Sequence, residues 1–428
     1  MVANKASKTM GMKIASSENL PASDSDPFYI VTPPYTRLSA GVRVLHALCH
    51  HLNMLGERAF VVPYPLNLRN DPSWPHFARF HDQPLVDWNL NTPLLTQEIA
   101  DWHYESEVVP ITIYPEVFDD PISAPFIVRY ILNYPGLLAP KYKTPHDMTL
   151  SYSRRLANYV GADPVLHLPV VDMNFFYSKK SHRSGNCFYA GKYRIYGGDL
   201  SLLPSDSVEI LRSEQMTREE VRDIFWSKKV FYCFEDSALA IEACLCGCAV
   251  IFRPNPHFKD GPISSYEFGN DGMAWGADDD EVVRALNTVS LVKDRLHDLY
   301  AQVPEEVSKF SRAAKFLTIG REYKARIVLP YNPKTVFVQQ SRVNAMSAMG
   351  CGGPGGDAMY RQWYNIFGLH ESDGQVMAER MMQQWRHQPA IHLIVVLRRG
   401  EGVRLAATLD SLSTQIYAGW GLTVLAEE

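Results

Sequence analysis

The segment at residues 231–252, FYCFEDSALAIEACLCGCAVIF, carries the residue types expected of a phosphate-binding turn. An apolar run leads into a tight turn at Phe234 to Asp236, and a helical pattern follows from Ser237 to Cys246. Gly247 suits the left-handed cap that ends such a helix. A helix start at this place offers unpaired backbone N–H groups and the positive end of the helix dipole, which together favour a phosphate group.

Small and polar side chains surround this helix start. Ser237 and Ala238 would let the backbone approach a diphosphate, and Glu242, about one turn later, could accept hydrogen bonds from ribose hydroxyls. Glu235 and Asp236 flank the same turn. The alternative is structural: Ser237 only caps the helix, and Glu242 is a solvated surface charge.

A glycine and a lysine follow another apolar run, CFYA from Cys187. Gly191 and Lys192 would stand at the carboxyl end of a parallel strand, where α/β sheets bind their ligands. The ammonium group of Lys192 could neutralise a departing diphosphate. Alternatively, Lys192 is an exposed side chain that follows a strand and binds nothing.

The loop TPPYTRLSAG, after the first apolar run of the chain, has small residues at Ser39, Ala40 and Gly41. Their backbone N–H groups could approach a sugar phosphate, and Arg37 could contact a phosphate or an acceptor. A glycine at the start of a helix is also common for structural reasons alone.

Glu116 follows the apolar run ITIYP and would lie at the carboxyl end of a strand. At that end of a parallel strand its carboxylate could contact a bound ligand. The alternative is a loop carboxylate paired with Arg129.

Two series of alternating strands and helices must position these residues. In the first series, an apolar run at 28–31, a helical pattern and a strand at 59–62 indicate a βαβ unit and hence a parallel sheet. Residues 108–114 predict a further strand, 152–160 a short helix and 164–171 a buried strand.

The second series restarts after Asp172. A helix begins at Thr217, where Glu220 forms a capping box. Two long helical patterns, at 279–300 and 305–323, would pack on the outside of the second sheet. The expected strands of this sheet begin at Cys187, Val208, Lys229 and Cys248.

The last hundred residues change character. Helical stretches at 333–388 are interrupted by CGGPGGD and favour a linker or connecting helices. At Ile391 a new strand, HLIVVL, is followed by a helical pattern and by LTVL near the end of the sequence. We interpret this as another βαβ beginning that stops before it closes.

The composition fits a soluble globular protein of at least two domains, with 428 residues, 46% hydrophobic and 21% charged. The net charge of -5 offers no general attraction for nucleic acid, and no apolar run suits a signal peptide or a membrane span. Seven cysteines, an odd number in a long chain, favour a reducing cytoplasm.

The positions of the cysteines and histidines indicate structural roles and not metal binding. Cys244, Cys246 and Cys248 cross a helix end into a strand and have no histidine nearby, so we interpret them as small buried side chains and not as a zinc site. The histidines of the helix after the first strand have no further ligand that the sequence can locate.

The segment around Glu242 resembles the nucleotide-binding motif of GT-B glycosyltransferases of the large retaining class. In that motif two glutamates bracket a helix start, and Glu-Ala, small-Gly and Pro-Val-Ile follow. Here Glu242-Ala243, Cys246-Gly247 and Ala249-Val250-Ile251 stand in those places. Glu235 is one residue out of the usual register, which puts its role in question.

The stretch HLPVVDMNFF and the pair Gly191-Lys192 resemble the hinge and the end of the first strand of the C-terminal domain in this class.

Two further stretches resemble transferases of polysaccharide synthesis. Residues 111–136 are similar to bacterial capsule and O-antigen glycosyltransferases at Tyr114, Pro115, Glu116, Arg129, Asn133, Pro135 and Gly136. Residues 391–428 resemble the opening of a family-2 GT-A domain, whose metal-binding acidic motif would lie downstream. We therefore expect a fragment of a longer polypeptide with several transferase domains.

These resemblances imply an α/β fold, with two Rossmann-like domains that face a cleft (GT-B) and a C-terminal partial α/β segment. The expected divisions are a flexible tail at 1–27, an N-terminal acceptor domain at 28–165, a C-terminal nucleotide-sugar domain at 166–332, connecting helices or a linker at 333–388 and a truncated GT-A domain at 389–428.

The function implied is a glycosyltransferase of the hexosyltransferase type, which moves a sugar from a nucleotide-diphosphate sugar to a glycan or lipid-linked acceptor in capsule or O-antigen synthesis. Catalytic roles fall to Glu116 and Lys192. Nucleotide-sugar contacts fall to Gly41, Gly191, Lys192, Glu235, Ser237, Ala238 and Glu242. Substrate contacts fall to Arg37, Ser39, Tyr114 and Arg129.

The resemblance also implies the partners of the chain. We expect no metal or other cofactor and no nucleic acid, a cytoplasmic location with peripheral association at the inner face of the membrane, and downstream transferase domains. The alternative is a non-catalytic module that binds a nucleotide-sugar or serves as a scaffold for a neighbouring transferase.

Overall fold

The computed structural model describes residues 26–64, 90–179, 182–201, 203–211, 216–330, 391–397, 405–406, 408–409, 412 and 420–426. The chain divides into two units, of which the larger spans residues 26–367 and the smaller contains the strands near the C-terminus. Residues 1–25 of the tail predicted at 1–27, and the connecting helices predicted at 333–388, lie outside the described residues.

A five-stranded parallel sheet forms the first half of the larger unit, in the order β2-β1-β3-β4-β5. Nearly all of its strand residues are buried, as expected for a parallel sheet with covered faces. The predicted βαβ opening is confirmed, because β1 pairs with β2 in parallel. The elements are β1 (Phe28–Thr32), α1 (Ala40–Met54), β2 (Ala59–Pro63), α2 (Gln97–Glu105), β3 (Ile111–Pro115), β4 (Phe126–Ile131), β5 (Met148–Ser151) and α3 (Arg154–Val160).

A second five-stranded parallel sheet follows, in the order β10-β9-β8-β6-β7. The capping box at Thr217 and Glu220 is confirmed, since each residue's side chain accepts a hydrogen bond from the other's backbone N–H. The elements are β6 (Asn186–Tyr189), α4 (Lys192–Ile195), β7 (Val208–Glu209), α5 (Arg218–Ser227), β8 (Val230–Cys233), α6 (Leu239–Leu245), β9 (Ala249–Phe252), α7 (Ser265–Phe268), β10 (Met273–Trp275), α8 (Asp279–Thr288), the 3-10 turn Val289–Leu291 and α9 (Val292–Thr318).

The two sheets repeat one topology. If the strands of each half are numbered along the chain, both sheets read 2-1-3-4-5, which is a doubly wound α/β order. The predicted fold of two Rossmann-like halves is therefore confirmed. The strand order reverses between β1 and β3 in the first half and between β6 and β8 in the second. Doubly wound sheets bind ligands at the carboxyl ends of the strands at this reversal.

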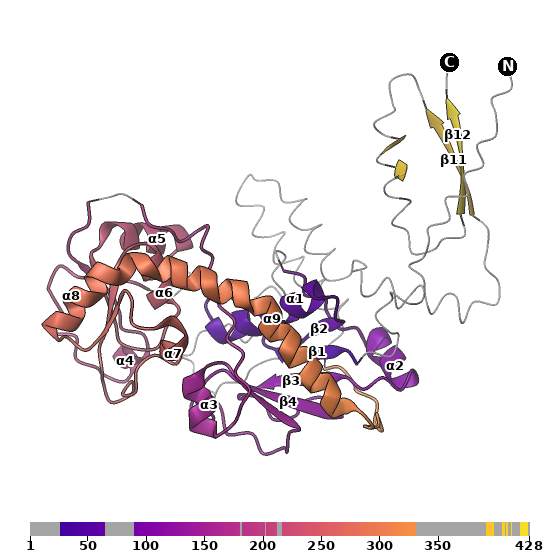
Figure 1. Cartoon of the computed structure of the whole chain (residues 1–428), viewed down its shortest axis with the longest axis horizontal. Helices are drawn as coiled ribbons and strands as arrows, with labels where there is room; N and C mark the ends of the chain where they lie inside the picture. Colours follow the sequence, from indigo (N-terminus) through magenta and orange to yellow (C-terminus); the bar gives the residue numbers. More distant parts are fainter. Residues whose placement is uncertain are drawn as a thin grey trace. The chain divides into compact units, whose positions relative to one another are not determined.

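Helix α9 belongs to both halves, and Figure 1 shows it as the long orange helix that runs from one half to the other. Its N-terminal part packs on α6, and its C-terminal part packs on α1 and β3. Val307 and Phe310 belong to the hydrophobic core of the first half. Of the two helices predicted outside the second sheet, α8 does pack there, on β9 and β10. The second was wrongly placed, because α9 continues through Pro304 and crosses to the first half.

Residues 164–171 do not form the predicted strand. They contribute a single bridge between Ser151 and Val165, although Leu166 and Leu168 are buried as expected. Pro164 and Pro169 lack the backbone N–H that a ladder requires. The segment therefore leaves the edge of the first sheet and continues into the second half.

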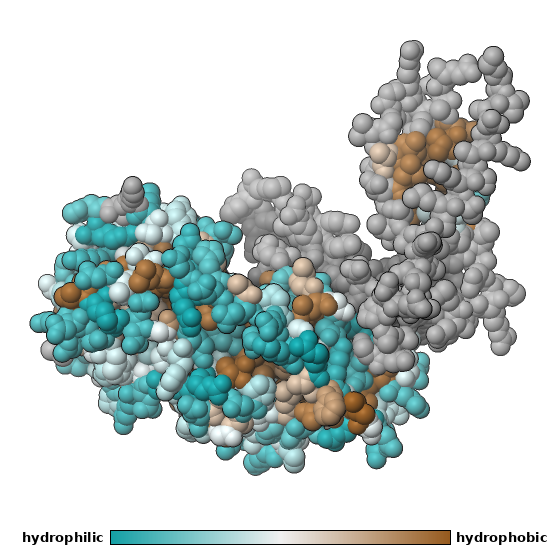
Figure 2. All heavy atoms as spheres, viewed as in Figure 1, coloured by the Kyte–Doolittle hydropathy of each residue, from teal (hydrophilic) through white to brown (hydrophobic). Residues whose placement is uncertain are grey.

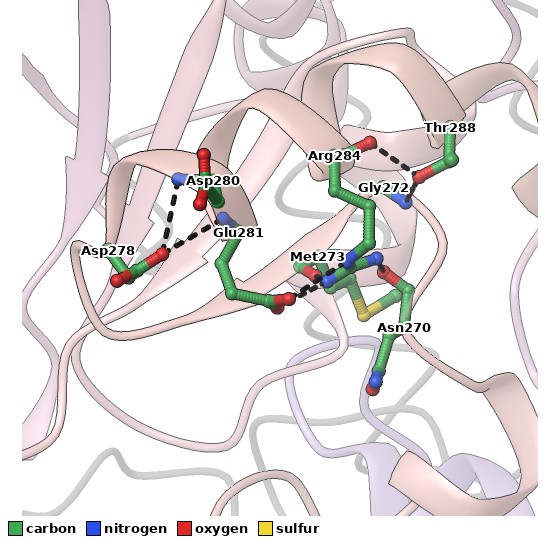
Figure 3. A network of polar contacts seen from close by, with 8 residues as sticks. All are labelled: Asn270, Gly272, Met273, Asp278, Asp280, Glu281, Arg284 and Thr288. Carbon is green, nitrogen blue, oxygen red and sulfur yellow. Dashed lines mark hydrogen bonds and ion pairs between the residues drawn. The ribbon is translucent and has the colours of Figure 1, made fainter.

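Arg284 of α8 anchors the turn that precedes β10. Figure 3 shows its guanidinium group between the carboxylate of Glu281, at 2.7 Å, and the backbone carbonyl groups of Asn270 and Met273, at 2.5 and 2.7 Å. The hydroxyl of Thr288 accepts a hydrogen bond from the backbone N–H of Gly272 at 3.0 Å. These contacts attach the edge strand of the second sheet to α8.

The smaller unit contains the parallel pair β11 (Ile391–Leu397) and β12 (Trp420–Ala426), with helical residues between them at 405–406, 408–409 and 412. This parallel pair was predicted. Ile391 and Ile394, on opposite faces of β11, are both exposed, and Figure 2 shows an apolar patch in this unit. Apolar side chains on both faces are typical of central strands in parallel sheets.

Candidate functional site

One cavity of about 700 Å³ lies at the carboxyl ends of both sheets, and we call it the cleft cavity. The loops after β1, β3, β6 and β8 line it, so the strand-order reversals of both halves face the same space. The structure brings eight of the predicted site residues together here. These are Ser39, Gly41, Glu116, Gly191, Lys192, Glu235, Ser237 and Ala238.

A neighbouring cavity of about 600 Å³, which we call the side cavity, contains Arg37 and Glu242. The two cavities share lining residues, so they adjoin. The shared residues are Leu38, Pro169, Val170, Val171, Ile210 and Leu211. A ligand that extends from Ser237 to Glu242 would therefore occupy both cavities.

Glu116 follows directly on β3, as predicted, and only 4% of the residue is exposed. Its Oε2 atom accepts a hydrogen bond from the backbone N–H of Leu132 at 2.9 Å. Burial raises the pKa of the Glu116 carboxyl group to about 7, and the hydrogen bond from Leu132 moderates that rise. A buried carboxyl group with this pKa at the wall of a cleft can exchange a proton near neutral pH.

Tyr114 and Arg129, predicted as substrate contacts, line neither cavity because both are fully buried. Arg129 donates hydrogen bonds to the carbonyl groups of Phe118, at 2.6 Å, and Asp119, at 2.9 Å. The Tyr114 hydroxyl donates to Asp120 at 2.8 Å. The alternative in which Arg129 pairs with Glu116 does not describe the structure either. Instead, Arg129 holds the turn after Glu116.

Glu235 lies against the loop that carries Gly191 and Lys192. Its Oε2 atom accepts a hydrogen bond from the backbone N–H of Lys192 at 2.8 Å. Gly191 has φ of 51°, and a Cβ atom at this position would lie 2.5 Å from Cδ of Glu235. Only glycine allows this approach. The turn after β8 and the loop after β6 are thereby joined at the cleft cavity.

Ser237 and Asp236 complete the turn before α6. The Ser237 hydroxyl accepts a hydrogen bond from the backbone N–H of Leu239, the first residue of α6, at 3.3 Å, although Ala238 and not Ser237 holds the N-cap position. Asp236 also lines the cleft cavity and accepts a hydrogen bond from the backbone N–H of Ile263 at 2.7 Å. Asp236 is exposed to solvent.

Glu242 is 8% exposed, which contradicts the alternative of a solvated surface charge. Its partner is Arg43 of α1, with Nη1 of Arg43 at 3.6 Å from Oε1 of Glu242. The sequence analysis missed Arg43, because no local pattern links residues so far apart in the chain. The sequence analysis placed Asp236 beside Glu235 in the same turn but gave it no role.

All six described cysteines are buried and free, as predicted for Cys244, Cys246 and Cys248. The described ranges contain no group of three or more His, Cys, Asp or Glu residues that could hold a metal ion. In the same ranges, no helix is long and apolar enough to cross a membrane.

Comparison with known proteins returns similar folds and no close relative. No family model matches the sequence, and no curated protein matches it.

Three solved structures that align with this chain are glycosyltransferases. SnogD from Streptomyces nogalater has a TM-score of 0.30 and 11% identity, over 69% of this chain and 99% of that chain. An alpha-glucosyltransferase in complex with UDP and a 13-mer DNA has a TM-score of 0.34 and 14% identity, over 74% and 99%. The glycosyltransferase of kitacinnamycin has a TM-score of 0.34 and 11% identity, over 69% and 99%. Scores this low do not identify the activity of this chain.

Proposed function

We propose that this chain is a GT-B glycosyltransferase that transfers a sugar from a nucleotide-diphosphate sugar to a saccharide acceptor. One observation carries the proposal: the strand-order reversals of two parallel sheets line a single cavity, with Glu116 from the first half and Gly191, Lys192 and Ser237 from the second. Doubly wound sheets bind nucleotides at such a place. The second half would hold the nucleotide, and the first would hold the acceptor.

Glu116 and Lys192 would carry the transfer step. An acceptor hydroxyl oxygen forms a bond to the anomeric carbon of the donor sugar, and its proton passes to the Glu116 carboxylate. The bond between the anomeric carbon and the diphosphate oxygen breaks, and the nucleoside diphosphate leaves with the bonding electrons. The Lys192 ammonium group neutralises the charge that develops on the diphosphate.

The remaining site residues would hold the donor along both cavities. Glu242 would accept hydrogen bonds from the ribose hydroxyls in the side cavity. The backbone at Gly191, Ser237 and Ala238 would contact the diphosphate, and Glu235 would orient the loop of Gly191 through its bond to Lys192 N. Gly41, Ser39 and Arg37 would contact the sugar and the acceptor.

The finer assignment concerns the biological setting. We place the chain in the cytoplasm, in capsule or O-antigen synthesis, with a glycan or lipid-linked acceptor presented at the inner face of the membrane. Residues 389–428 would begin a GT-A domain of family-2 type, for which the parallel pair of β11 and β12 is the opening. The resemblances of residues 111–136 and 391–428 support this assignment.

Mass spectrometry of acceptor products tests the proposed activity. The full chain is incubated with UDP-, GDP- and dTDP-hexoses and a panel of saccharide and lipid-linked acceptors. We expect one acceptor to gain the mass of one hexose, with release of the matching nucleoside diphosphate. Nucleotide binding without hydrolysis or transfer on the whole panel would favour the non-catalytic binding module instead.

A further inference from the structure

Arg43 and Glu242 form an ion pair between the two halves of the larger unit. Arg43 lies in the first turns of α1, beside the first sheet, and Glu242 lies in α6, beside the second. Nη1 of Arg43 is 3.6 Å from Oε1 of Glu242, and the two side chains are 11% and 10% exposed. The same Nη1 atom donates a hydrogen bond to the backbone carbonyl of Val170, in the segment that connects the halves, at 3.0 Å.

The connecting segment is itself fixed on the other side. The Tyr300 hydroxyl of α9 exchanges hydrogen bonds with the backbone of Val171, at 3.0 Å to the N–H and 2.7 Å to the carbonyl. Arg43 therefore lies where α1, the connecting segment, α6 and α9 meet. Its position relative to Glu242 depends on the arrangement of both halves.

Both members of the pair keep unused hydrogen-bonding capacity. Among the described residues, Arg43 is the only charged group within ion-pair distance of Glu242, and none of them donates a hydrogen bond to the carboxylate oxygens of Glu242. Nε and Nη2 of Arg43 are shielded from solvent and have no hydrogen-bond partner in the same ranges. Arg129, by contrast, donates to three carbonyl groups and has a structural role.

This geometry leaves Glu242 suited to a ligand with hydroxyl groups. A carboxylate has about four acceptor sites, and the contact to Arg43 uses one oxygen. The second oxygen remains available at the wall of the side cavity, which Arg43 also lines. The neighbouring guanidinium group of Arg43 fixes the direction of this carboxylate.

We propose that Arg43 is a positioning residue for the nucleotide site: it holds Glu242 across the boundary between the halves, so that Glu242 binds the ribose hydroxyls only when the two halves are in place. This inference rests on the proposed nucleotide-sugar function and extends it. The nucleotide site is then composite, because α1 of the acceptor half completes a site that lies otherwise on the second half.

A cycle that combines a protein variant with a ligand variant tests the proposal. Calorimetric titration compares wild type, Arg43→Met and Arg43→Lys with UDP or GDP, whichever binds wild type more tightly, and with its 2′,3′-dideoxy counterpart. We expect Arg43→Met to raise the Kd of the ribonucleotide about tenfold and to change the Kd of the dideoxynucleotide less than about twofold. Arg43→Lys retains a cation and should recover most of the affinity.

Three results would overturn the role of Arg43. The first is an equal effect of Arg43→Met on both nucleotides, which would indicate a general structural role. The second is an unchanged Kd of the ribonucleotide in that variant. The third is tighter binding of the ribonucleotide in that variant, which would indicate that Arg43 competes with the ribose. Arg312→Met, an exposed change on α9, is the matched control and should bind like wild type. If wild type binds neither UDP nor GDP, this inference fails, and if wild type does not bind dTDP either, the proposed function fails with it.

Discussion

Glu116 combines a buried carboxyl group with a position at the wall of the cleft cavity. Burial destabilises the ionised form, and the hydrogen bond from Leu132 N–H compensates only in part. The result is a group that loses its proton near neutral pH. At the scale of single residues, this is the property that a proton acceptor for a sugar hydroxyl requires.

Glu116 should set the pH dependence of transfer. Because the base must be ionised, kcat/KM of wild type should rise as pH increases through about 7. Glu116→Gln should lower kcat by about 10²- to 10⁴-fold and remove this rise, with little change in nucleotide Kd. Steady-state transfer rates measured from about pH 5.5 to about pH 9 check this prediction. Glu105→Gln, an exposed change in α2, is the control; an unaltered profile in Glu116→Gln would exclude Glu116 as the base.

Single residues also show which parts of the site could be predicted from the sequence. Glu116, Lys192 and Ser237 could be placed because each follows a recognisable strand, and parallel strands end at a common edge. Arg129 could not be placed, because its partners are carbonyl groups that only the folded turn brings together. Arg43 escaped notice for the same reason, since its partner Glu242 comes from the other half of the unit.

At the scale of elements, the loop between β6 and α4 depends on a glycine. Gly191→Ala would place a methyl group against Glu235 and would also strain a backbone with positive φ. Gly197→Ala provides the matched control, because its φ of 74° imposes a similar strain while nothing lies within 4 Å. We expect both variants to lose about 1 kcal/mol of unfolding free energy, and only Gly191→Ala to weaken nucleotide binding. Equal nucleotide affinity in the two variants would show that the Glu235 contact does not shape the site.

Helix α8 should stabilise the edge of the second sheet through Arg284. Arg284→Met removes the hydrogen bonds to the carbonyl groups of Asn270 and Met273 and the ion pair with Glu281. Because the group is partly exposed, we expect a loss of about 1 to 2 kcal/mol, measured by urea denaturation. Arg312→Met should change the unfolding free energy by less than about 0.5 kcal/mol. A loss no larger in Arg284→Met than in Arg312→Met would contradict the role given to this network.

Elements were predictable where one local pattern decides them. The strands β1, β6 and β8 are apolar runs bounded by turn residues, and the start of α5 has its capping box. Residues 164–171 and helix α9 were not predictable in the same way. Burial without a strand partner and a helix that continues through Pro304 both depend on packing between the halves, which local sequence does not report.

At the scale of the whole molecule, two halves with one repeated topology place their strand-order reversals around a common cavity. Helix α9 packs on both halves, and Arg43 connects α1 to α6. We therefore expect nucleotide binding to depend on the arrangement of the two halves.

Glu116 should also influence the stability of the whole fold. Its pKa is raised from 4.5 to about 7, so the folded state binds more protons than the unfolded state between these values. The unfolding free energy contributed by Glu116 therefore falls as pH rises from 4.5 to 7, by up to roughly 3 kcal/mol. Urea denaturation at several pH values should show Glu116→Gln gaining stability relative to wild type as pH rises. A constant difference across this window would contradict the buried ionisation of Glu116.

The most direct test of the account is a calorimetric titration of the full chain with UDP, GDP and dTDP, for wild type and for Glu242→Gln. We predict saturable binding of at least one nucleotide with a Kd below about 1 mM, and a Kd about tenfold higher in Glu242→Gln. Binding of none of the three nucleotides to wild type, or equal affinity in wild type and Glu242→Gln, would contradict it.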